Sequence, residues 1–365
     1  MKIAVVGSRG IPNYYGGFEQ FAEYLSLGLV KKGHDVTVYN PHFHPYQKSE
    51  FKKVTIVHKW CPENLIGAAA HFIYDYLSLR DALQKKFDVI LMLGYATSVI
   101  AYLCLPINNS VIITNMDGLE WKRDKWSPAV KKLTKWFEKV GVKKSHFLVS
   151  DNKGIQDHID ETYNQASTMI PYGAEVCAIP EDNTLINEYQ LESFDYYVLV
   201  ARLEPENNIE LILDGYVQSK SNVKFIVIGN HKTAYGKTLQ EKYVGTNVEF
   251  LGGVYDMNVL NHIRYFSRVY FHGHSVGGTN PSLLEAMASH SYIAAHDNPF
   301  NRSVLEEGAF YFKTSLDVEK IINSYQDLAK NRDRKVALNL NKIRSDYSWD
   351  TIIGQYEDLF IKAIR

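Results

Sequence analysis

Short apolar runs alternate with amphipathic segments along the whole chain. Lys2–Val6 is an apolar run that ends at a glycine, and Phe18–Lys31 follows it with apolar residues at helical spacing. Val36–Tyr39 is the next apolar run. Such alternation predicts buried parallel strands with helices covering both faces of the sheet. The pattern therefore predicts an α/β fold with a doubly wound sheet.

The alternation starts again near residue 195. Strands are expected at Tyr197–Ala201, Lys224–Ile228, Val248–Leu251, Val269–His272 and Tyr292–Ala294. Helices are expected between them at Asn208–Val217, Tyr235–Val244, Met257–Tyr265 and Ser282–Ala288. The polar stretch Ile179–Glu192 precedes the restart and has the composition of a linker. We expect two Rossmann-like domains facing a central cleft, with ligands bound beyond the carboxyl ends of the strands.

One stretch, Val89–Met116, contains no charged residue. Gly94, Pro106 and the pair Asn108–Asn109 divide it, so its unbroken apolar run falls short of the roughly 20 residues that a membrane-spanning helix needs. We interpret the stretch as a strand at Val89–Leu93, a helix at Thr97–Leu105 and a strand at Val111–Thr114.

The composition fits a two-domain globular protein. The 365 residues are 45% apolar and 22% charged, enough for a core in each domain. Lys and Arg number 40 against 41 Asp and Glu, and this balance argues against a protein that grips nucleic acid with its whole surface. The three cysteines form no C-x-x-C pair, so we expect neither a disulfide framework nor a structural zinc site. No signal-peptide pattern is present, and we expect a cytoplasmic location.

The loop Gly7–Glu19, GSRGIPNYYGGFE, joins the first strand to the first helix. Gly16 and Gly17 stand at the mouth of that helix, where free amides and the helix dipole favour a phosphate. The spacing is not G-x-G-x-x-G, which weighs against an oxidoreductase that binds a dinucleotide. A plain glycine-rich turn is the alternative reading of this loop.

A second loop, ARLEPENN, places Arg202 directly after a strand. A guanidinium at that position suits a diphosphate, because it is always charged and contacts two oxygens at once. A salt bridge to Glu204 or Glu206 is the alternative.

A third segment, HGHSVGGTNPSLLEAMA, runs from a strand end through a glycine loop into a helix. Asn280 is expected to be the N-cap, leaving the amides of Ser282 and Leu283 unpaired as an anion site. Glu285, one turn further on, could accept hydrogen bonds from two vicinal hydroxyls, as on a ribose. It could also only complement the helix N-terminus.

These segments resemble the retaining glycosyltransferases of the GT-B fold, in the large fourth family, over nearly the whole chain. Gly16–Glu19 resembles the family's amino-terminal glycine loop, Val198–Asn208 its G-R-L-x-x-E-K segment, and Pro281–Ala288 its P-L-L-E-A-M-A helix. Ser348–Asp350, followed by Tyr356, resembles its carboxy-terminal helix. The resemblance implies an acceptor domain at residues 1–178 completed by a helix at 350–365, a linker at 179–193 and a donor domain at 194–349.

The longer motifs GSRGIPNYYGGFE, MDGLEWKRDKW and HGHSVGGTNPSLLEAM resemble a branch of bacterial rhamnosyltransferases that build capsules, O-antigens and rhamnose-rich wall polysaccharides. This resemblance implies dTDP-β-L-rhamnose as the donor and a lipid-diphosphate-linked sugar as the acceptor. The implied donor-binding residues are Gly16, Gly17, Arg202, Asn207, Gly278, Thr279, Asn280, Ser282, Leu283 and Glu285.

The chain departs from the family pattern at three places. The first of the family's two glutamates is Gly277 here, which weighs against a glucosyl or galactosyl donor and fits a 6-deoxy sugar. The family's lysine near the diphosphate is Asn207, so Lys232 or Arg9 would have to supply that charge. The family's histidine in the first domain aligns with Asp117.

Candidate acids of the first domain follow its strands. Asp117 comes after Val111–Thr114, where an acid could orient the sugar or take the acceptor's proton. Glu120 and Asp151 are further candidates, and each of the three could instead cap a helix or support a turn. The candidates for contact with the acceptor are Tyr15, Tyr95 and Tyr172. No D-x-D pair exists, so we expect no metal and no other cofactor; Arg202 and helix N-termini would neutralise the leaving group.

Residues 121–144 form a basic segment with nine Lys or Arg and two Asp or Glu, a local charge of +7. Three of the five tryptophans lie here, and apolar residues recur at helical spacing after Pro128. Such a helix can lie on an anionic membrane. The expected membrane face comprises Trp126, Lys131, Lys132, Lys135 and Trp136. The alternative is a surface helix whose apolar stripe covers the first domain.

The sequence thus predicts a retaining rhamnosyltransferase at the inner face of the cell membrane, with no nucleic-acid partner. The same fold with another donor, such as a UDP-hexose or a different deoxysugar, remains an alternative. An inactive nucleotide-sugar-binding partner of a larger assembly is another, because Gly277 and Asn207 replace two functional residues of the family.

Overall fold

The computed structural model describes residues 1–107, 110–123 and 126–365, and these form two compact units. The first comprises Met1–Tyr172 and Trp349–Arg365, and the second comprises Gly173–Ser348. The boundary lies before the predicted residue 178. The predicted linker 179–193 is part of the second unit and contains the short helix α7 (Thr184–Asn187), whose Ile186 is buried.

The first unit is built on an eight-stranded sheet with the order β3-β4-β2-β1-β5-β6-β7-β8, in which β3 alone is antiparallel. Its strands are β1 (Lys2–Val6), β2 (Asp35–Pro41), β3 (Glu50–Phe51), β4 (Val54–Lys59), β5 (Val89–Leu93), β6 (Val111–Asn115), β7 (Phe147–Ser150) and β8 (Thr168–Met169). Its longer helices are α1 (Gly17–Lys31), α3 (Ala70–Lys85), α4 (Val99–Cys104), α5 (Pro128–Lys144), α6 (Lys153–Tyr163) and α16 (Trp349–Ala363). A four-residue helix, α2 (Glu63–Ile66), precedes α3.

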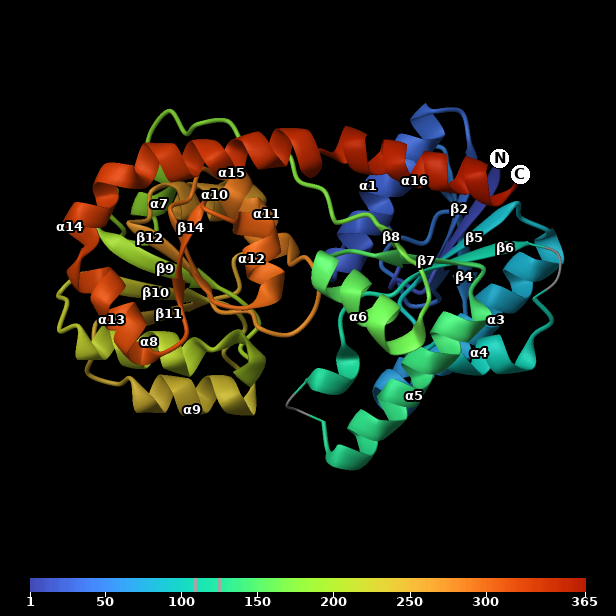
Figure 1. Cartoon of the computed structure of the whole chain (residues 1–365), viewed down its shortest axis with the longest axis horizontal. Helices are drawn as coiled ribbons and strands as arrows, with labels where there is room; N and C mark the ends of the chain where they lie inside the picture. Colours follow the sequence, from blue (N-terminus) through green and yellow to red (C-terminus); the bar gives the residue numbers. More distant parts are fainter. Residues whose placement is uncertain (108–109, 124–125) are drawn as a thin grey trace. The chain divides into compact units, whose positions relative to one another are not determined.

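The central strands of this sheet are apolar throughout because helices cover both of their faces. All five residues of β5 are buried, as are Ile3–Val6 of β1. Helices α1 and α16 pack against each other, and α4 packs against α3 and α5 (Figure 1). Trp349 of α16 stacks on Tyr24 of α1, with ring centroids 4.4 Å apart.

The second unit has a six-stranded sheet with the order β11-β10-β9-β12-β13-β14, and every pairing is parallel. Its strands are β9 (Tyr196–Val200), β10 (Lys224–Ile228), β11 (Val248–Gly252), β12 (Val269–His272), β13 (Ile293–His296) and β14 (Ala309–Phe312). Its remaining helices are α8 (Ile209–Gln218), α9 (Ala234–Lys242), α10 (Met257–Tyr265), α11 (Pro281–Ala288), α12 (Pro299–Leu305), α13 (Ser315–Asn323), α14 (Tyr325–Leu328) and α15 (Arg332–Asp346). Tyr197, Phe225 and Phe271 form the aromatic centre of the core.

The strand orders locate the places where a ligand can enter each sheet. In the first unit the order reverses between β1 and β5, and in the second it reverses between β9 and β12. Loops on either side of such a reversal diverge and leave a crevice at the carboxyl edge. The loops after β1, β9 and β12 are the ones singled out from the sequence.

The uncharged segment folds as predicted, into β5, α4 and β6, and Asn108–Asn109 within it lie outside the described residues. Among the helices that the structure describes, none combines the length and the hydropathy needed to span a bilayer.

Candidate functional site

The two loops at the strand reversal of the second unit hold each other in place. Asn207 donates from Nδ2 to the carbonyl of Arg202 (2.7 Å), and its Oδ1 lies 2.9 Å from Nδ1 of His274. Asn208 donates to the carbonyl of Gly273 (2.7 Å). Asn207 is buried, and both ends of its side-chain amide are engaged. We predicted that it contacts the donor, but in the structure it shapes the loop instead.

Arg202 lies at the mouth of this crevice, two residues beyond the end of β9. Its side chain is exposed, and the described part of the chain contains no ion pair to it from Glu204 or Glu206. Glu206 is itself buried. The guanidinium is therefore placed to meet an anion from outside, as the diphosphate reading requires.

The start of α11 differs from the prediction. Asn280 is the N-cap as expected, but its Oδ1 accepts the hydrogen bond of the Ser282 amide (2.9 Å). The amide of Leu283 donates to the Asn280 carbonyl (2.9 Å). Both amides predicted to bind an anion are thus satisfied by the cap, because a capping side chain takes the donors that would otherwise be free.

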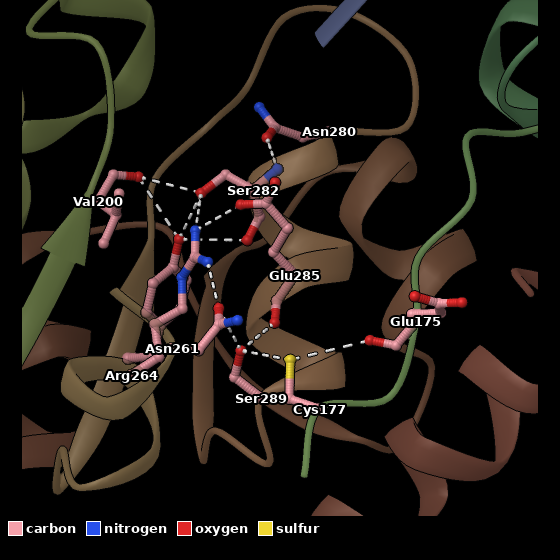
Figure 2. A network of polar contacts seen from close by, with 10 residues as sticks. Glu175, Cys177, Val200, Asn261, Arg264, Asn280, Ser282, Glu285 and Ser289 are labelled. Carbon is pink, nitrogen blue, oxygen red and sulfur yellow. Dashed lines mark hydrogen bonds and ion pairs between the residues drawn. The ribbon is translucent and has the colours of Figure 1, made fainter. Parts of the chain in front are cut away.

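Glu285 does not complement the helix N-terminus; it forms an ion pair with Arg264 of α10 (Figure 2). Nη2 of Arg264 lies 2.7 Å from Oε2 of Glu285 and 3.3 Å from Oγ of Ser282. The same hydroxyl lies 2.9 Å from the Tyr270 hydroxyl. Sequence reasoning missed Arg264, since an arginine in the last turn of an amphipathic helix is usually a surface residue.

A pocket of about 450 Å³ lies at the carboxyl ends of β10 and β11. His231, Lys232 and Tyr255 line it together with Asn230 and residues 251–253. Lys232 is exposed and so can supply positive charge on this edge of the sheet. At the end of β12, burial holds the pKa of His272 well below its usual value, so that imidazole is neutral at pH 7.

In the first unit, the glycine loop depends on Gly7 and Gly10. Gly7 has φ +95°, and a Cβ there would lie 2.6 Å from the carbonyl oxygen of Leu93. Gly10 has φ +94° and packs against the side chain of Asn40. The amide of Gly16 donates to Oδ1 of Asn13 (3.2 Å), so it is not the free phosphate-binding amide that we predicted. Gly17 begins α1.

Two of the candidate acids gather at the carboxyl edge of the first sheet. Asp117 follows β6, and its backbone φ is +50°. Residues other than glycine seldom adopt this left-handed conformation, and those that do are concentrated at functional sites. Asp151 directly follows β7 and is buried. Burial raises the pKa of Tyr172 well above its usual value, and the charges of Asp117 and Asp151 raise it further. All three residues therefore lie near one another.

Glu19 belongs to the same edge, although the sequence singled it out only as part of a motif. It is buried, and its carboxylate accepts a hydrogen bond from the Arg9 amide (2.7 Å). Burial raises the pKa of this carboxyl group, while that hydrogen bond lowers it. Its charge also contributes to the raised pKa of Tyr172. The signal that could have identified Glu19 in the sequence was its position as an acidic residue within the glycine loop Gly7–Glu19.

The remaining first-domain candidates divide between exposed and engaged side chains. Tyr15 is exposed and its ring lies 3.8 Å from the guanidinium of Arg9. Glu120 is paired with Arg123 (2.8 Å). Tyr95 is buried with its hydroxyl 3.4 Å from Glu138, so it is a core residue and not the acceptor contact that we predicted.

Helix α5 has a buried face and a basic outer face. Phe137, Glu138 and Val140 are buried, whereas Leu133 and Trp136 are about half exposed, at 49% and 47%. Lys132, Lys135, Lys139 and Lys143 are exposed around them. Of the other predicted membrane residues, Lys131 is half-buried and Trp126 is half-buried with its indole 3.4 Å from Glu120. Residues 124–125 of the basic segment lie outside the described chain.

One group of metal-ligating side chains occurs within the described ranges: Cys61, Glu63 and His71, whose ligand atoms lie within 4.8 Å of one another. Arg9 already forms an ion pair with Glu63 (3.2 Å), so this arginine is not free to serve a donor diphosphate. The described loops that follow the strands of the second unit contain no comparable group of metal-ligating side chains.

The comparisons with known proteins agree with this architecture. Residues 183–344 match the family model "Glycosyl transferases group 1", and residues 1–175 match a domain of unknown function named DUF1972. No curated protein sequence matches the chain. The match to the group 1 glycosyl transferase model thus lies within the second unit, Gly173–Ser348.

Solved structures with low sequence identity share the fold over the full length. Sucrose-phosphate synthase from Thermosynechococcus elongatus is 13% identical with a TM-score of 0.80, covering 99% of this chain and 98% of its own. HepE from Anabaena, solved with UDP-glucose, is 13% identical with a TM-score of 0.76, covering 99% and 100%. Trehalose 6-phosphate synthase from Burkholderia multivorans is 12% identical with a TM-score of 0.74, covering 100% and 98%. The chain has the GT-B fold.

Proposed function

We propose that this protein is a retaining glycosyltransferase that moves L-rhamnose from dTDP-β-L-rhamnose to a sugar acceptor in bacterial cell-surface polysaccharide synthesis. One observation carries the proposal: an exposed Arg202 and the partly exposed carboxylate of Glu285 stand at the same strand reversal of a group 1 glycosyl transferase domain. A cation and a hydroxyl acceptor at that edge suit the diphosphate and the pentose of a nucleotide sugar.

The donor diphosphate is assigned to Arg202. Since Asn280 occupies the first amides of α11, the neutralising charge comes from side chains, and Lys232 is the second basic group at this edge. The charge that develops on the leaving diphosphate is stabilised most by groups already fixed in place. No metal is required in this arrangement, because the guanidinium supplies the positive charge.

The chemical step is a front-face substitution. The bond between the rhamnose C1 and the diphosphate oxygen breaks, and the acceptor oxygen bonds to C1 on the same face. The acceptor's proton passes to the departing phosphate, so the products are dTDP and the extended saccharide. Asp117 or Asp151 of the first unit orients the acceptor hydroxyl, and the exposed Tyr15 is assigned to an acceptor contact. Tyr172 is buried against Phe18 and Phe21 and supports this edge instead.

A lipid-diphosphate-linked acceptor would bring the enzyme to the inner face of the cell membrane. The basic outer face of α5, with Leu133 and Trp136 half exposed among lysines, supports such a peripheral contact with anionic lipid. This proposal does not depend on the identity of the donor.

A second candidate donor is UDP-glucose or another UDP-hexose, because the HepE structure of the same fold was solved with UDP-glucose. Calorimetric titration with dTDP and with UDP separates the two, and tighter binding of dTDP is expected. Much tighter binding of UDP would contradict the rhamnose assignment. Transfer from labelled dTDP-rhamnose to a GlcNAc-diphosphate-lipid analogue then tests activity, and binding without transfer would favour an inactive partner protein.

A further inference from the structure

Arg264 is a fully buried arginine whose charge is met by one carboxylate. Its side chain is 1% exposed at the end of α10, and its guanidinium contacts Asn261 (3.2 Å), Ser282 (3.3 Å) and Glu285 (2.7 Å). The first two partners are neutral. A buried guanidinium is costly without an anion, so Glu285 and Arg264 depend on each other.

The ion pair makes the two oxygens of the Glu285 carboxylate different from each other (Figure 2). Oε2 is held by Nη2 of Arg264, whereas the described residues provide no hydrogen bond to Oε1. The side chain of Glu285 is 21% exposed, so the carboxylate is reachable from solvent. Oγ of Ser282, which shares Nη2 of Arg264, lies 3.4 Å from the carbonyl of Val200. The carboxylate therefore lies at the carboxyl edge, next to the end of β9.

We propose that Arg264 is a positioning residue that fixes Oε2 of Glu285 and leaves Oε1 as the single acceptor for the donor's pentose. The inference rests on the proposed function, in which Glu285 contacts that pentose. A ribose presents two vicinal hydroxyls and is matched by a carboxylate with both oxygens available, whereas a 2-deoxyribose presents one. The site is thus built for the sugar nucleotides of 2′-deoxynucleosides, the chemical class of dTDP-rhamnose.

The surrounding hydrogen bonds keep the pair in one geometry. Oδ1 of Asn261 accepts from Arg264, and the Ser289 hydroxyl lies 3.0 Å from that oxygen and 2.7 Å from the Glu285 carbonyl, so its single proton is shared between the two acceptors. Helices α10 and α11 are therefore connected through both the carboxylate and the backbone carbonyl of Glu285. The hydrogen bond from Arg264 to Oε2 therefore holds the carboxylate with Oε1 on its other side.

The test compares ligands that differ only at the 2′ position. Calorimetry with UDP and dUDP gives a ratio of dissociation constants that is independent of the base. In the wild type we expect dUDP to bind at least as tightly as UDP. In Arg264→Met, Oε2 becomes available and UDP should gain about five-fold or more over dUDP, the effect of one hydrogen bond. A purely structural role for Arg264 would weaken both ligands equally.

Arg332→Met is the matched control, since this half-buried arginine of the same unit donates only to backbone carbonyls, those of Tyr265, Ser267 and Arg268. It should leave the ratio at the wild-type value. A wild type that prefers UDP by about ten-fold, or an Arg264→Met protein with an unchanged ratio, would overturn the inference. If Arg264→Met does not fold, dTDP against 5-methyluridine diphosphate decides the specificity with the wild type alone. Absence of binding by any of these diphosphates would instead refute the proposed donor site.

Discussion

The side-chain amide of Asn115 donates a hydrogen bond of 3.2 Å to the hydroxyl of Tyr356, and both groups are buried. Asn115 ends β6, and its Oδ1 accepts the backbone amide of Asp117 (3.0 Å). One side chain thus connects α16, the last helix of the chain, to the loop that holds Asp117 in its positive-φ conformation. The carboxy-terminal helix is therefore part of the acid-bearing edge of the first unit.

Tyr356→Phe should destabilise the protein and disturb the Asp117 loop together. Removing the hydroxyl leaves the buried Asn115 amide without this acceptor, which costs about 1–3 kcal/mol. Urea unfolding measures the loss, and the transfer assay should show a lower turnover. Tyr14→Phe is the control, because Tyr14 is 64% exposed and its change should lie within about 0.5 kcal/mol of zero. Equal stability of Tyr356→Phe and wild type would show that the hydrogen bond contributes nothing.

Gly7→Ala and Gly33→Ala should separate backbone strain from steric overlap. Both glycines have similar φ values, +95° and +88°, but a Cβ at Gly33 meets no atom within 4 Å. Gly33→Ala should therefore cost only the strain of a left-handed alanine, about 1–2 kcal/mol. Gly7→Ala adds the overlap with the Leu93 carbonyl and should cost about 2 kcal/mol more. Chemical denaturation measures the free energy of unfolding of both variants. Equal losses would show that the close approach of β1 and β5 adds nothing to the cost of a Cβ at Gly7.

Asp75 and Asp81 of α3 should show opposite pH dependences. Burial raises the pKa of Asp75 to about 6, so the folded state binds the extra proton between pH 4 and 6 and stability falls as pH rises through that range. Asp75→Asn removes this loss and keeps an oxygen to accept from Ser98. It should be more stable than wild type by about 3 kcal/mol at pH 8 and equal to it near pH 4.

Asp81→Asn is the opposite case. Burial raises the pKa of Asp81, but hydrogen bonds from Lys59, Tyr39 and Lys85 outweigh it and hold the pKa at about 2. The ionised carboxylate thus stabilises the fold above pH 4, and this contribution disappears as pH falls toward 2. Asp81→Asn should lose about 2 kcal/mol at pH 7. Free energies of unfolding measured from pH 3 to pH 8 for both variants would contradict these assignments if the two curves moved in the same direction.

Arg202→Ala should lower turnover by about 100- to 1,000-fold, because it removes the charge that stabilises the leaving diphosphate. The dissociation constant of dTDP should rise as well. Arg344→Ala provides the control, since Arg344 is an exposed arginine on α15. Steady-state kinetics with dTDP-rhamnose measures the effect, and near-wild-type transfer by Arg202→Ala would refute the diphosphate assignment.

Charge reversal on α5 should release the protein from anionic vesicles. Each lysine near the surface contributes about 1 kcal/mol, so Lys132/Lys139/Lys143→Glu should reduce partitioning by about 100-fold or more. Lys48/Lys52/Lys53→Glu changes the net charge equally on an exposed loop of the same unit and should reduce it far less. Co-sedimentation with phosphatidylserine vesicles makes the comparison. Equal losses in both variants would indicate attraction by net charge alone, without a specific membrane face.

Long and strongly patterned elements could be read directly from the sequence. The predicted bounds of β5, β10, β12 and α10 coincide with those in the structure, because buried parallel strands and an amphipathic helix carry their signal in consecutive residues. The strands β4 and β14 were not predicted, and neither were the two-residue strands β3 and β8. Such short segments contain too few alternations to form a pattern, and they pair only because a neighbouring strand is already in place.

The sequence by itself determined the two α/β units, the glycine loop, the Asn280 cap and the positions of Arg202, Asp117 and Glu285 after their strands, since all of these depend on local spacing. The tertiary structure alone decided which groups remain available. Asn280 takes the amides that the helix start seemed to offer, and Tyr95 turns into the core. Arg264 meets Glu285 across 21 positions and Asn115 meets Tyr356 across 241. A hydrogen bond or ion pair between separate elements depends on packing distance, and no periodicity within one element records it.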